Sequence, residues 1–208
     1  MLTLNEIFRK HSCDKGDLNH HYHTLYQADF ESLRDLPITL LEVGIFKGES
    51  INAWVEYFPN AQIYCLDIFT RVPSTDIPIL THPRVHHLHC DSTDFAAEVY
   101  IKTIWKNPMF DIIIDDGLHT PSGNAKTFNN LIGMVKSGGA YYVEDVWELD
   151  RPEVRTHSWI VKSPKDYSLD QYQTYLDSLY PYPFTRHDFT AFKPDGVIHK
   201  IVKLQLQK

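Results

Sequence analysis

Two stretches decide the fold: Phe110-Asp111-Ile112-Ile113-Ile114-Asp115-Asp116-Gly117-Leu118-His119 and Gly139-Ala140-Tyr141-Tyr142-Val143-Glu144-Asp145. Each begins with a short, mostly apolar run typical of a buried strand and ends in acidic residues. If the two strands are parallel neighbours, their carboxyl ends lie at one edge of the sheet, where open α/β sheets place their ligands. We therefore expect three carboxylates and one imidazole to converge at that edge.

The acidic residues at these strand ends are Asp115, Asp116, Glu144 and Asp145. Carboxylates that crowd together repel one another unless a cation lies between them or some of them take up protons. Oxygen ligands without a nearby thiolate suit Mg²⁺, with Mn²⁺ or Ca²⁺ as alternatives, rather than zinc. A metal-assisted reaction is the first hypothesis, and the alternative is that these acids only cap the helices that follow them.

Composition narrows the class of protein. The 208 residues suffice for one well-buried domain, and the 43% apolar and 23% charged content is ordinary for a soluble protein. The net charge of −7 argues against a nucleic acid as partner. Three widely spaced cysteines favour a reducing compartment over a thiolate zinc site. The chain has neither a signal-peptide core nor an apolar run of about 18 residues, so we expect a cytoplasmic protein without a membrane span.

Apolar runs alternate with helical patterns along most of the chain, which predicts an α/β fold with a doubly wound, mostly parallel, Rossmann-like sheet. Two alternating runs around Pro194-Asp195-Gly196 predict a C-terminal antiparallel hairpin. The expected strands are 38–43, 63–68, 85–90, 110–115, 139–144, 184–192 and 197–206. The expected helices are 17–36, 50–57, 92–104 (with Ser92 as its N-cap), 122–136 (closed by 137–139) and 168–180.

We expect residues 1–208 to form a single domain with four parts. The first is an N-terminal helical cap, and the second is the core that binds cofactor and metal. A substrate lid region and the hairpin complete the domain. The respective boundaries are 1–36, 37–146, 147–183 and 184–208.

The turn after the first strand carries Glu42, Gly44 and Gly48, and glycines there let a ligand approach the backbone closely. Phe46 occupies the position of the second glycine in the dinucleotide fingerprint, which weakens a pyrophosphate-binding interpretation. Asp67 ends the second strand, where a carboxylate can accept hydrogen bonds from ribose hydroxyls. Asp91-Ser92 follow the third strand, where they can contact an adenine. Ribose and adenine recognition without a phosphate site favours S-adenosylmethionine.

These motifs resemble the class I S-adenosylmethionine-dependent methyltransferases. Within that class the chain is similar to the Mg²⁺-dependent sugar O-methyltransferases that act on macrolide deoxysugars. The resemblance covers about residues 14–146. The stretches that carry it are Leu41 to Gly44, Tyr57 to Phe69, Phe110 to His119, Gly138 to Asp145 and, nearer the N-terminus, Asp14-Lys15-Gly16 with His21-Tyr22 and Tyr26.

The resemblance implies that Asp116, Glu144 and Asp145 hold the metal and that His119 is the general base. It also implies a sugar acceptor, and two adjacent hydroxyls that bind the metal together would suit a rhamnose-like deoxyhexose. Leu118 and Cys90 depart from the family's usual small residue and glycine. The residues that we predict to contact the cofactor are Lys15, Tyr22, Glu42, Gly44, Gly48, Asp67, Ile68, Asp91, Ser92 and Asp115.

Two other functions fit the same scaffold. One is a metal-dependent hydroxylase or other oxidoreductase, although non-haem iron sites usually use two histidines and one carboxylate. The other is an inactive sugar-binding domain. As partners we expect a carbohydrate (a glycan or glycoside) and no nucleic acid. The chain would act as a homodimer or as one module of a larger glycan-building protein.

Overall fold

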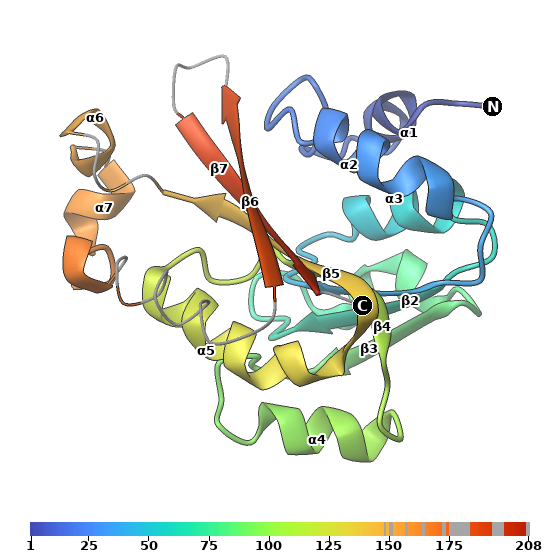
Figure 1. The fold of residues 1–208 in the computed structure, drawn as a ribbon. Coiled ribbons are helices and arrows are strands. Elements are labelled where there is room, and N and C mark those ends of the chain that lie inside the picture. The colour runs from blue at the N-terminus through green and yellow to red at the C-terminus, as the bar shows by residue number, and fades with distance from the viewer. Residues whose placement is uncertain are drawn as a thin grey trace.

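A computed structural model describes residues 1–147, 149, 152–156, 158–163, 165–171, 174, 184–192 and 198–206. These residues include a seven-stranded sheet in the order β3-β2-β1-β4-β5-β7-β6 (Figure 1). The first five strands in this order pair in parallel, whereas β7 pairs antiparallel with both β5 and β6. The strands are β1 (Thr39–Val43), β2 (Gln62–Asp67), β3 (Val85–His89), β4 (Phe110–Asp115), β5 (Val135–Val146), β6 (Phe184–Phe192) and β7 (Ile198–Leu206).

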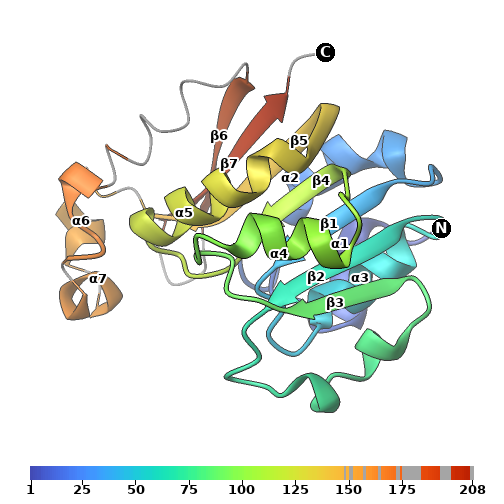
Figure 2. The ribbon, with the colours of Figure 1, turned by 90° about the horizontal axis from the view of Figure 1, so that it is seen from below.

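Helices cover both faces of the sheet (Figures 1 and 2). One face packs against α1 (Leu4–Lys10), α2 (His23–Phe30) and α3 (Glu49–Tyr57), and the other packs against α4 (Ala97–Ile104) and α5 (Pro121–Leu131). The remaining helical segments are short: η1 (Glu31–Leu33), η2 (Ser74–Asp76), η3 (Pro78–Thr81), η4 (Ile132–Met134), α6 (Pro152–Arg155) and α7 (Ser158–Lys162).

Alternation along the central strands builds a separate apolar core on each face. Leu40, Ile112 and Tyr142 belong to the core beneath α1–α3, whereas their neighbours Leu41 and Ile113 belong to the core beneath α4 and α5. The doubly wound fold and the C-terminal antiparallel pair that the sequence predicted are therefore confirmed.

The N-terminal region differs from its prediction. The expected helix over 17–36 is only α2 followed by the single turn η1, and α1 was not predicted at all. His21 has a left-handed backbone with a φ of 61°, which prevents a continuous helix before α2. Thr3 and Glu6 form a reciprocal capping box that starts α1.

Two helix boundaries were also wrong. Ser92 does not cap α4, which begins at Ala97; its hydroxyl is instead bonded to that of Thr127 at 2.8 Å. Helix α5 ends at Leu131, and the Gly138-Gly139 pair lies within β5 rather than in a helix C-cap. A Cβ at Gly139 would lie 2.9 Å from the carbonyl oxygen of Asp111, so this glycine is needed where β5 passes close to β4.

The region predicted to be irregular, 147–167, contains the short helices α6 and α7. Most of the predicted helix over 168–180 and the predicted turn at 194–196 lie outside the described residues. Within the described part of the chain, no helix combines the length and apolarity needed to cross a membrane.

Candidate active site

The predicted acidic residues Asp115, Asp116, Glu144 and Asp145 lie where β1, β4 and β5 end side by side. Asp115 is in register with Val43 on one side and Val143 on the other, so the acidic residues that follow share one edge of the sheet. Gly44 touches the same loop: a Cβ there would lie 2.2 Å from the carbonyl oxygen of Asp116. This close contact, together with the φ of 79° at Gly44, explains why a glycine occupies the position.

The backbone is strained at this edge. Phe46, Phe69, His119 and Asp145 all have φ values between 47° and 55°, in the left-handed region that non-glycine residues rarely adopt. They follow β1, β2 and β4 or lie near the end of β5. Strain of this kind costs about 1–3 kcal/mol per residue and concentrates at functional sites.

Three side chains at this edge form a group able to hold a metal ion. Ligand atoms of Asp116, His119 and Asp145 all lie within 4.8 Å of one another. Nε2 of His119 is 3.6 Å from Oδ1 of Asp116, while its Nδ1 is buried and finds no hydrogen-bond partner among the described residues. A mixed set of two carboxylates and one imidazole suits a divalent cation.

Two N-terminal side chains fix Asp145. The hydroxyl of Tyr22 donates to Oδ1 of Asp145 at 2.6 Å, and Nδ1 of His20 is 3.2 Å from the same oxygen. Burial lowers the pKa of His20, but hydrogen bonds to Asp14 and Asp145 outweigh burial and raise that pKa to about 9. Protonated His20 therefore compensates part of the negative charge at this edge.

Glu144 faces a different partner from its neighbour Asp145. Nζ of Lys15 is fully buried and donates to Oε2 of Glu144 at 2.7 Å and to Oδ2 of Asp116 at 2.5 Å. The hydroxyl of Tyr26 donates to the other oxygen of Glu144 at 2.5 Å. The structure thus unites Asp116 and Asp145 with His119, and it places Glu144 in a buried cluster around an ammonium ion.

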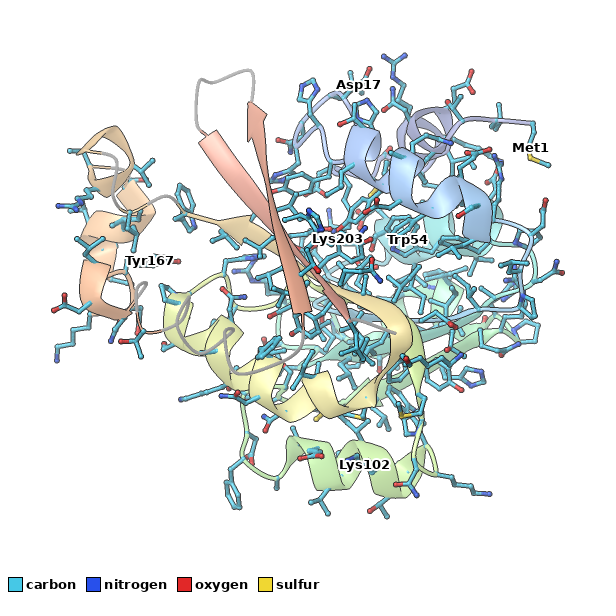
Figure 3. All side chains as sticks on the ribbon, viewed as in Figure 1. Met1, Asp17, Trp54, Lys102, Tyr167 and Lys203 are labelled. Atoms are coloured by element: carbon cyan, nitrogen blue, oxygen red, sulfur yellow. The ribbon has the colours of Figure 1, made fainter. Side chains whose placement is uncertain are left out.

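Glu42 completes this cluster. Its Oε1 is 3.4 Å from Nζ of Lys15, and its Oε2 accepts a hydrogen bond of 2.7 Å from the indole of Trp54, which is labelled in Figure 3. Burial would lower the pKa of Lys15, but Asp116, Glu144 and Glu42 outweigh burial and raise it well above its usual value. Lys15 is therefore a permanent cation among three carboxylates.

Asp67 ends β2 and lies beside the glycine turn that follows β1. Its Oδ2 accepts from the amides of Ile45 (2.8 Å) and Phe46 (3.3 Å), and its Oδ1 accepts from the amide of Phe69 (2.6 Å). In this structure the carboxylate therefore joins the turns that follow β1 and β2.

The other predicted cofactor residues are divided between surface and interior. Ile68 and Asp91 are exposed, and Oδ1 of Asp91 accepts from both the amide and the hydroxyl of Thr93. Ser92 points into the interior, as its bond to α5 shows. Gly48 precedes α3 and packs against Ile77 and Ile79 rather than against the acidic group.

Asp115 is completely buried; it directly precedes Asp116, one of the three residues of the metal-competent group (Asp116, His119 and Asp145). It accepts from the amide of Gly117 (3.2 Å) and from the side chain of Asn124 (3.1 Å). Burial raises its pKa to about 6, although both of these hydrogen bonds oppose the shift. Its ionised form is therefore disfavoured in the folded state.

Replacing Asp115 with asparagine should change how stability depends on pH. A folded-state pKa raised above the unfolded value of about 3.9 gives a stabilisation that is present below that value and lost as pH rises through 6. Because asparagine does not titrate, the variant should gain about 3 kcal/mol relative to the wild type between pH 4 and 7. Denaturant titrations of both proteins at matched pH check this; a pH-independent difference would contradict the assignment.

Sequence reasoning did not find His20 as a partner of Asp145 or Tyr26 as a partner of Glu144. One signal was available for Tyr26. Tyr22 and Tyr26 are four residues apart in a helical pattern, so their side chains share one mostly apolar face. A tyrosine that is buried on such a face needs a hydrogen-bond partner for its hydroxyl. Asp14, six positions before His20, is a local partner, but the contact between His20 and Asp145 joins residues more than 100 positions apart and has no local signal.

The strand order, the glycine turn after β1 and the acidic edge define the class I methyltransferase fold. The structure of MycE methyltransferase from the mycinamycin pathway in complex with Mg, SAH and mycinamycin VI matches with a TM-score of 0.71 and 22% identity, over 100% of this chain and 55% of that chain. A putative O-methyltransferase from Klebsiella pneumoniae matches with a TM-score of 0.66 and 14% identity, over 99% of this chain and 88% of that chain.

The chain's sequence is similar to curated sugar O-methyltransferases. The 8-demethyl-8-(2-methoxy-alpha-L-rhamnosyl)-tetracenomycin-C 3'-O-methyltransferase of Streptomyces olivaceus is 32% identical over 151 residues, which are 69% of this chain and 37% of that protein. The mycinamicin VI 2''-O-methyltransferase of Micromonospora griseorubida is 28% identical over 69% of this chain and 36% of its own length. The resemblance predicted from the sequence is confirmed.

No family model matches the chain. The chain spans only 36–37% of the length of these two curated relatives. The comparisons therefore establish the methyltransferase fold and the similarity to sugar O-methyltransferases. The activity, substrate and partners of this chain are proposed separately.

Proposed function

We propose that the chain is an S-adenosylmethionine-dependent, divalent-metal-dependent O-methyltransferase that acts on a sugar hydroxyl. The acceptor would be a rhamnose-like deoxyhexose of a glycan or glycoside. The observation that carries this proposal is the group formed by Asp116, His119 and Asp145, directly beside the glycine turn of a methyltransferase fold. The curated relatives named above methylate rhamnosyl or macrolide substrates according to their names.

The residues present fit a divalent cation. Oδ1 of Asp116 faces His119 while its Oδ2 is held by Lys15, so one oxygen is oriented toward the group. Asp145 is held by Tyr22 and His20. Asp116 and Asp145 would hold the ion, with Glu144 reaching it only if its bond to Lys15 breaks. A bound Mg²⁺ or Mn²⁺ would lower the pKa of a hydroxyl in contact with it.

His119 is suited to the role of general base. A hydroxyl held near Asp116 would also lie near Nε2 of His119, which is 3.6 Å from that carboxylate. The imidazole would accept the hydroxyl proton as the oxygen attacks the methyl donor, and Asp116 would stabilise the imidazolium that results. The ring is partly exposed, so it can meet a substrate from solvent. S-adenosylmethionine would supply an activated methyl group.

Buried polar groups beside the turn support a cofactor site. Oε1 of Glu42 is buried and has no hydrogen-bond partner among the described residues, although it is 3.4 Å from the ammonium of Lys15. Gly44 brings backbone close to this region, and Asp67 holds the turn in shape. We propose that the sugar and adenine parts of the cofactor bind along the ends of β1, β2 and β3.

The alternative of a metal-dependent hydroxylase receives less support from the donor set. The metal-competent group contains one histidine and two carboxylates, whereas non-haem iron sites usually present two histidines and one carboxylate. We also propose that the protein works in a reducing compartment, because Cys13, Cys65 and Cys90 are all free and buried.

Calorimetry with S-adenosylmethionine, in the presence and absence of Mg²⁺, tests the proposal. We expect cofactor binding together with methyl transfer from labelled cofactor to a rhamnoside with adjacent free hydroxyls. Binding without transfer to any member of a glycoside panel would favour the inactive sugar-binding alternative. Absence of cofactor binding would refute the methyltransferase assignment.

Replacing Asp116 with asparagine should weaken Mg²⁺ binding and methyl transfer together, because a neutral amide oxygen is a poorer ligand for a hard cation. We expect at least about a tenfold loss of Mg²⁺ affinity, or about 1.4 kcal/mol. Asp94 offers a matched control, since Asp94→Asn removes an exposed carboxylate that lies outside the group. An unchanged Mg²⁺ titration for Asp116→Asn would contradict its role as ligand.

A further inference from the structure

A β-bulge interrupts β5 at residues 144–145. The pairing with β7 covers three steps along β5, from Val143 to Val146, but only two steps along β7. A strand with one extra residue against its neighbour is a bulge, and the extra residue is left out of the ladder of hydrogen bonds. The packing shows the same shift. Val143 and Val146 are both buried in the core beneath α4 and α5, although residues three apart on a regular strand face opposite sides.

The bulge turns the side chain of Asp145. Regular alternation would place Asp145 on the same side of the sheet as Val143, beneath α4 and α5. Its backbone is instead left-handed, with a φ of 53°, and its carboxylate meets Tyr22 and His20 of the N-terminal region. Bulges near active sites commonly re-aim a side chain in this way. Here the bulge brings Asp145 into the metal-competent group.

One hydroxyl group holds the bulge in this conformation. The hydroxyl of Tyr22 accepts a hydrogen bond of 3.2 Å from the backbone amide of Asp145 and donates one of 2.6 Å to Oδ1 of the same residue. The first bond satisfies a backbone donor at the bulge, and the second fixes the carboxylate. Tyr22 is almost completely buried, so water does not compete for either bond.

The chain before α2 is folded so that it presents this hydroxyl. The amide of His20 donates to the carbonyl oxygen of Asp14 at 2.8 Å, and His21 has a left-handed φ of 61°. The ring of His20 stacks on that of Tyr22, with the ring centroids 5.2 Å apart, and Tyr22 leads directly into α2. The loop and the helix therefore both fix the position of the Tyr22 ring.

We propose that Tyr22 is a positioning residue of the metal site: its hydroxyl holds the bulge of β5 in the conformation that directs Asp145 at the cation. This inference rests on the proposed function, because it takes Asp145 as a metal ligand. Tyr22 acts through Asp145 and does not touch the ion. Removing a group that orients a metal ligand in this way costs about 10- to 100-fold in metal affinity.

Titration with Mn²⁺ tests the proposal without cofactor or acceptor, because the electron paramagnetic resonance signal of free Mn²⁺ reports binding in the absence of turnover. Tyr22→Phe keeps the ring and removes both hydrogen bonds, so the dissociation constant for Mn²⁺ should rise about tenfold. Tyr142→Phe is the matched control. It removes an equally buried phenol hydroxyl, which donates to Asp29 at 2.8 Å, and should leave the dissociation constant unchanged.

Two further measurements separate positioning from a general effect on folding. In the background of Asp145→Asn, Tyr22→Phe should weaken Mn²⁺ binding little further, because both substitutions act on the same ligand. Hydrogen exchange of the wild-type chain needs no variant. The amide of Asp145 should exchange slowly, since it donates to a buried oxygen.

The outcomes distinguish this inference from the proposed function. Wild-type Mn²⁺ affinity in Tyr22→Phe, additive losses in the double variant, or fast exchange of the Asp145 amide would overturn the role of Tyr22 and leave the metal site standing. A wild-type chain that binds no Mn²⁺ would overturn the metal-dependent function and this inference together.

Discussion

Replacement of His119 with alanine is expected to lower the rate of methyl transfer by about 10²- to 10⁴-fold while leaving the affinity for S-adenosylmethionine nearly unchanged. The imidazole lies beside Asp116, where it can take a proton from a bound hydroxyl, and the substitution removes this proton acceptor. Initial rates at saturating cofactor and acceptor, together with calorimetry, give the two quantities separately.

A matched control is His87→Ala, which removes an exposed histidine from β3 and should leave turnover intact. The fold should survive His119→Ala, because the ring is partly exposed and its Nδ1 makes no hydrogen bond among the described residues. Turnover of His119→Ala within a few-fold of the wild type would remove this residue from the mechanism. Equal losses in turnover and cofactor affinity would instead indicate a role in binding.

Replacement of Lys15 with methionine should be the most destabilising substitution at the site. Methionine fills a similar volume but leaves the buried Glu42 and Glu144 and the half-buried Asp116 without their shared cation. Breaking a buried ion pair from one side costs about 3–5 kcal/mol. We expect a decrease of this size in the free energy of unfolding near neutral pH, measured by denaturant titration.

Two comparisons make this result specific. Lys126→Met, on the exposed surface of α5, should change stability by less than about 0.5 kcal/mol. The double variant Lys15→Met with Glu144→Gln should recover part of the loss, because it removes one of the uncompensated charges. Saturating Mg²⁺ should stabilise Lys15→Met more than the wild type, since a dication can replace the missing ammonium. A loss no larger than that of Lys126→Met would contradict the described cluster.

The sheet could be predicted from the sequence because its central strands are buried on both faces. Such strands are short, continuous apolar runs, and the acids that end two of them stand out in the chain. The glycine pair at 138–139 was misread because a helix C-cap and a close contact between strands both favour glycine. The contact that identifies the second reason is the close approach of Gly139 to the carbonyl oxygen of Asp111 on β4, and it appears only once the strands are paired.

The site itself was predicted in part. Glu144 and Asp145 are neighbours on β5, and successive residues on a strand face opposite sides of the sheet. Glu144 therefore shares a side with Tyr142, beneath α1–α3, and meets Lys15 and Tyr26 there. Simple alternation would send Asp145 to the other side, but its φ of 53° breaks the alternation, and its side chain also meets the N-terminal region, through Tyr22 and His20. The burial of Lys15 has no such local signal, because tertiary partners alone determine it.

The partners at the site are distant in the sequence. Lys15 bonds to Glu144 across 129 positions, and Tyr22 bonds to Asp145 across 123. During synthesis on the ribosome, the N-terminal segment therefore emerges long before the strand that supplies its counter-charges. A lysine without partners stays hydrated, so this segment should dock only after β5 has left the exit tunnel. The acidic edge then forms late in folding, and a nascent chain halted before β5 would lack it entirely.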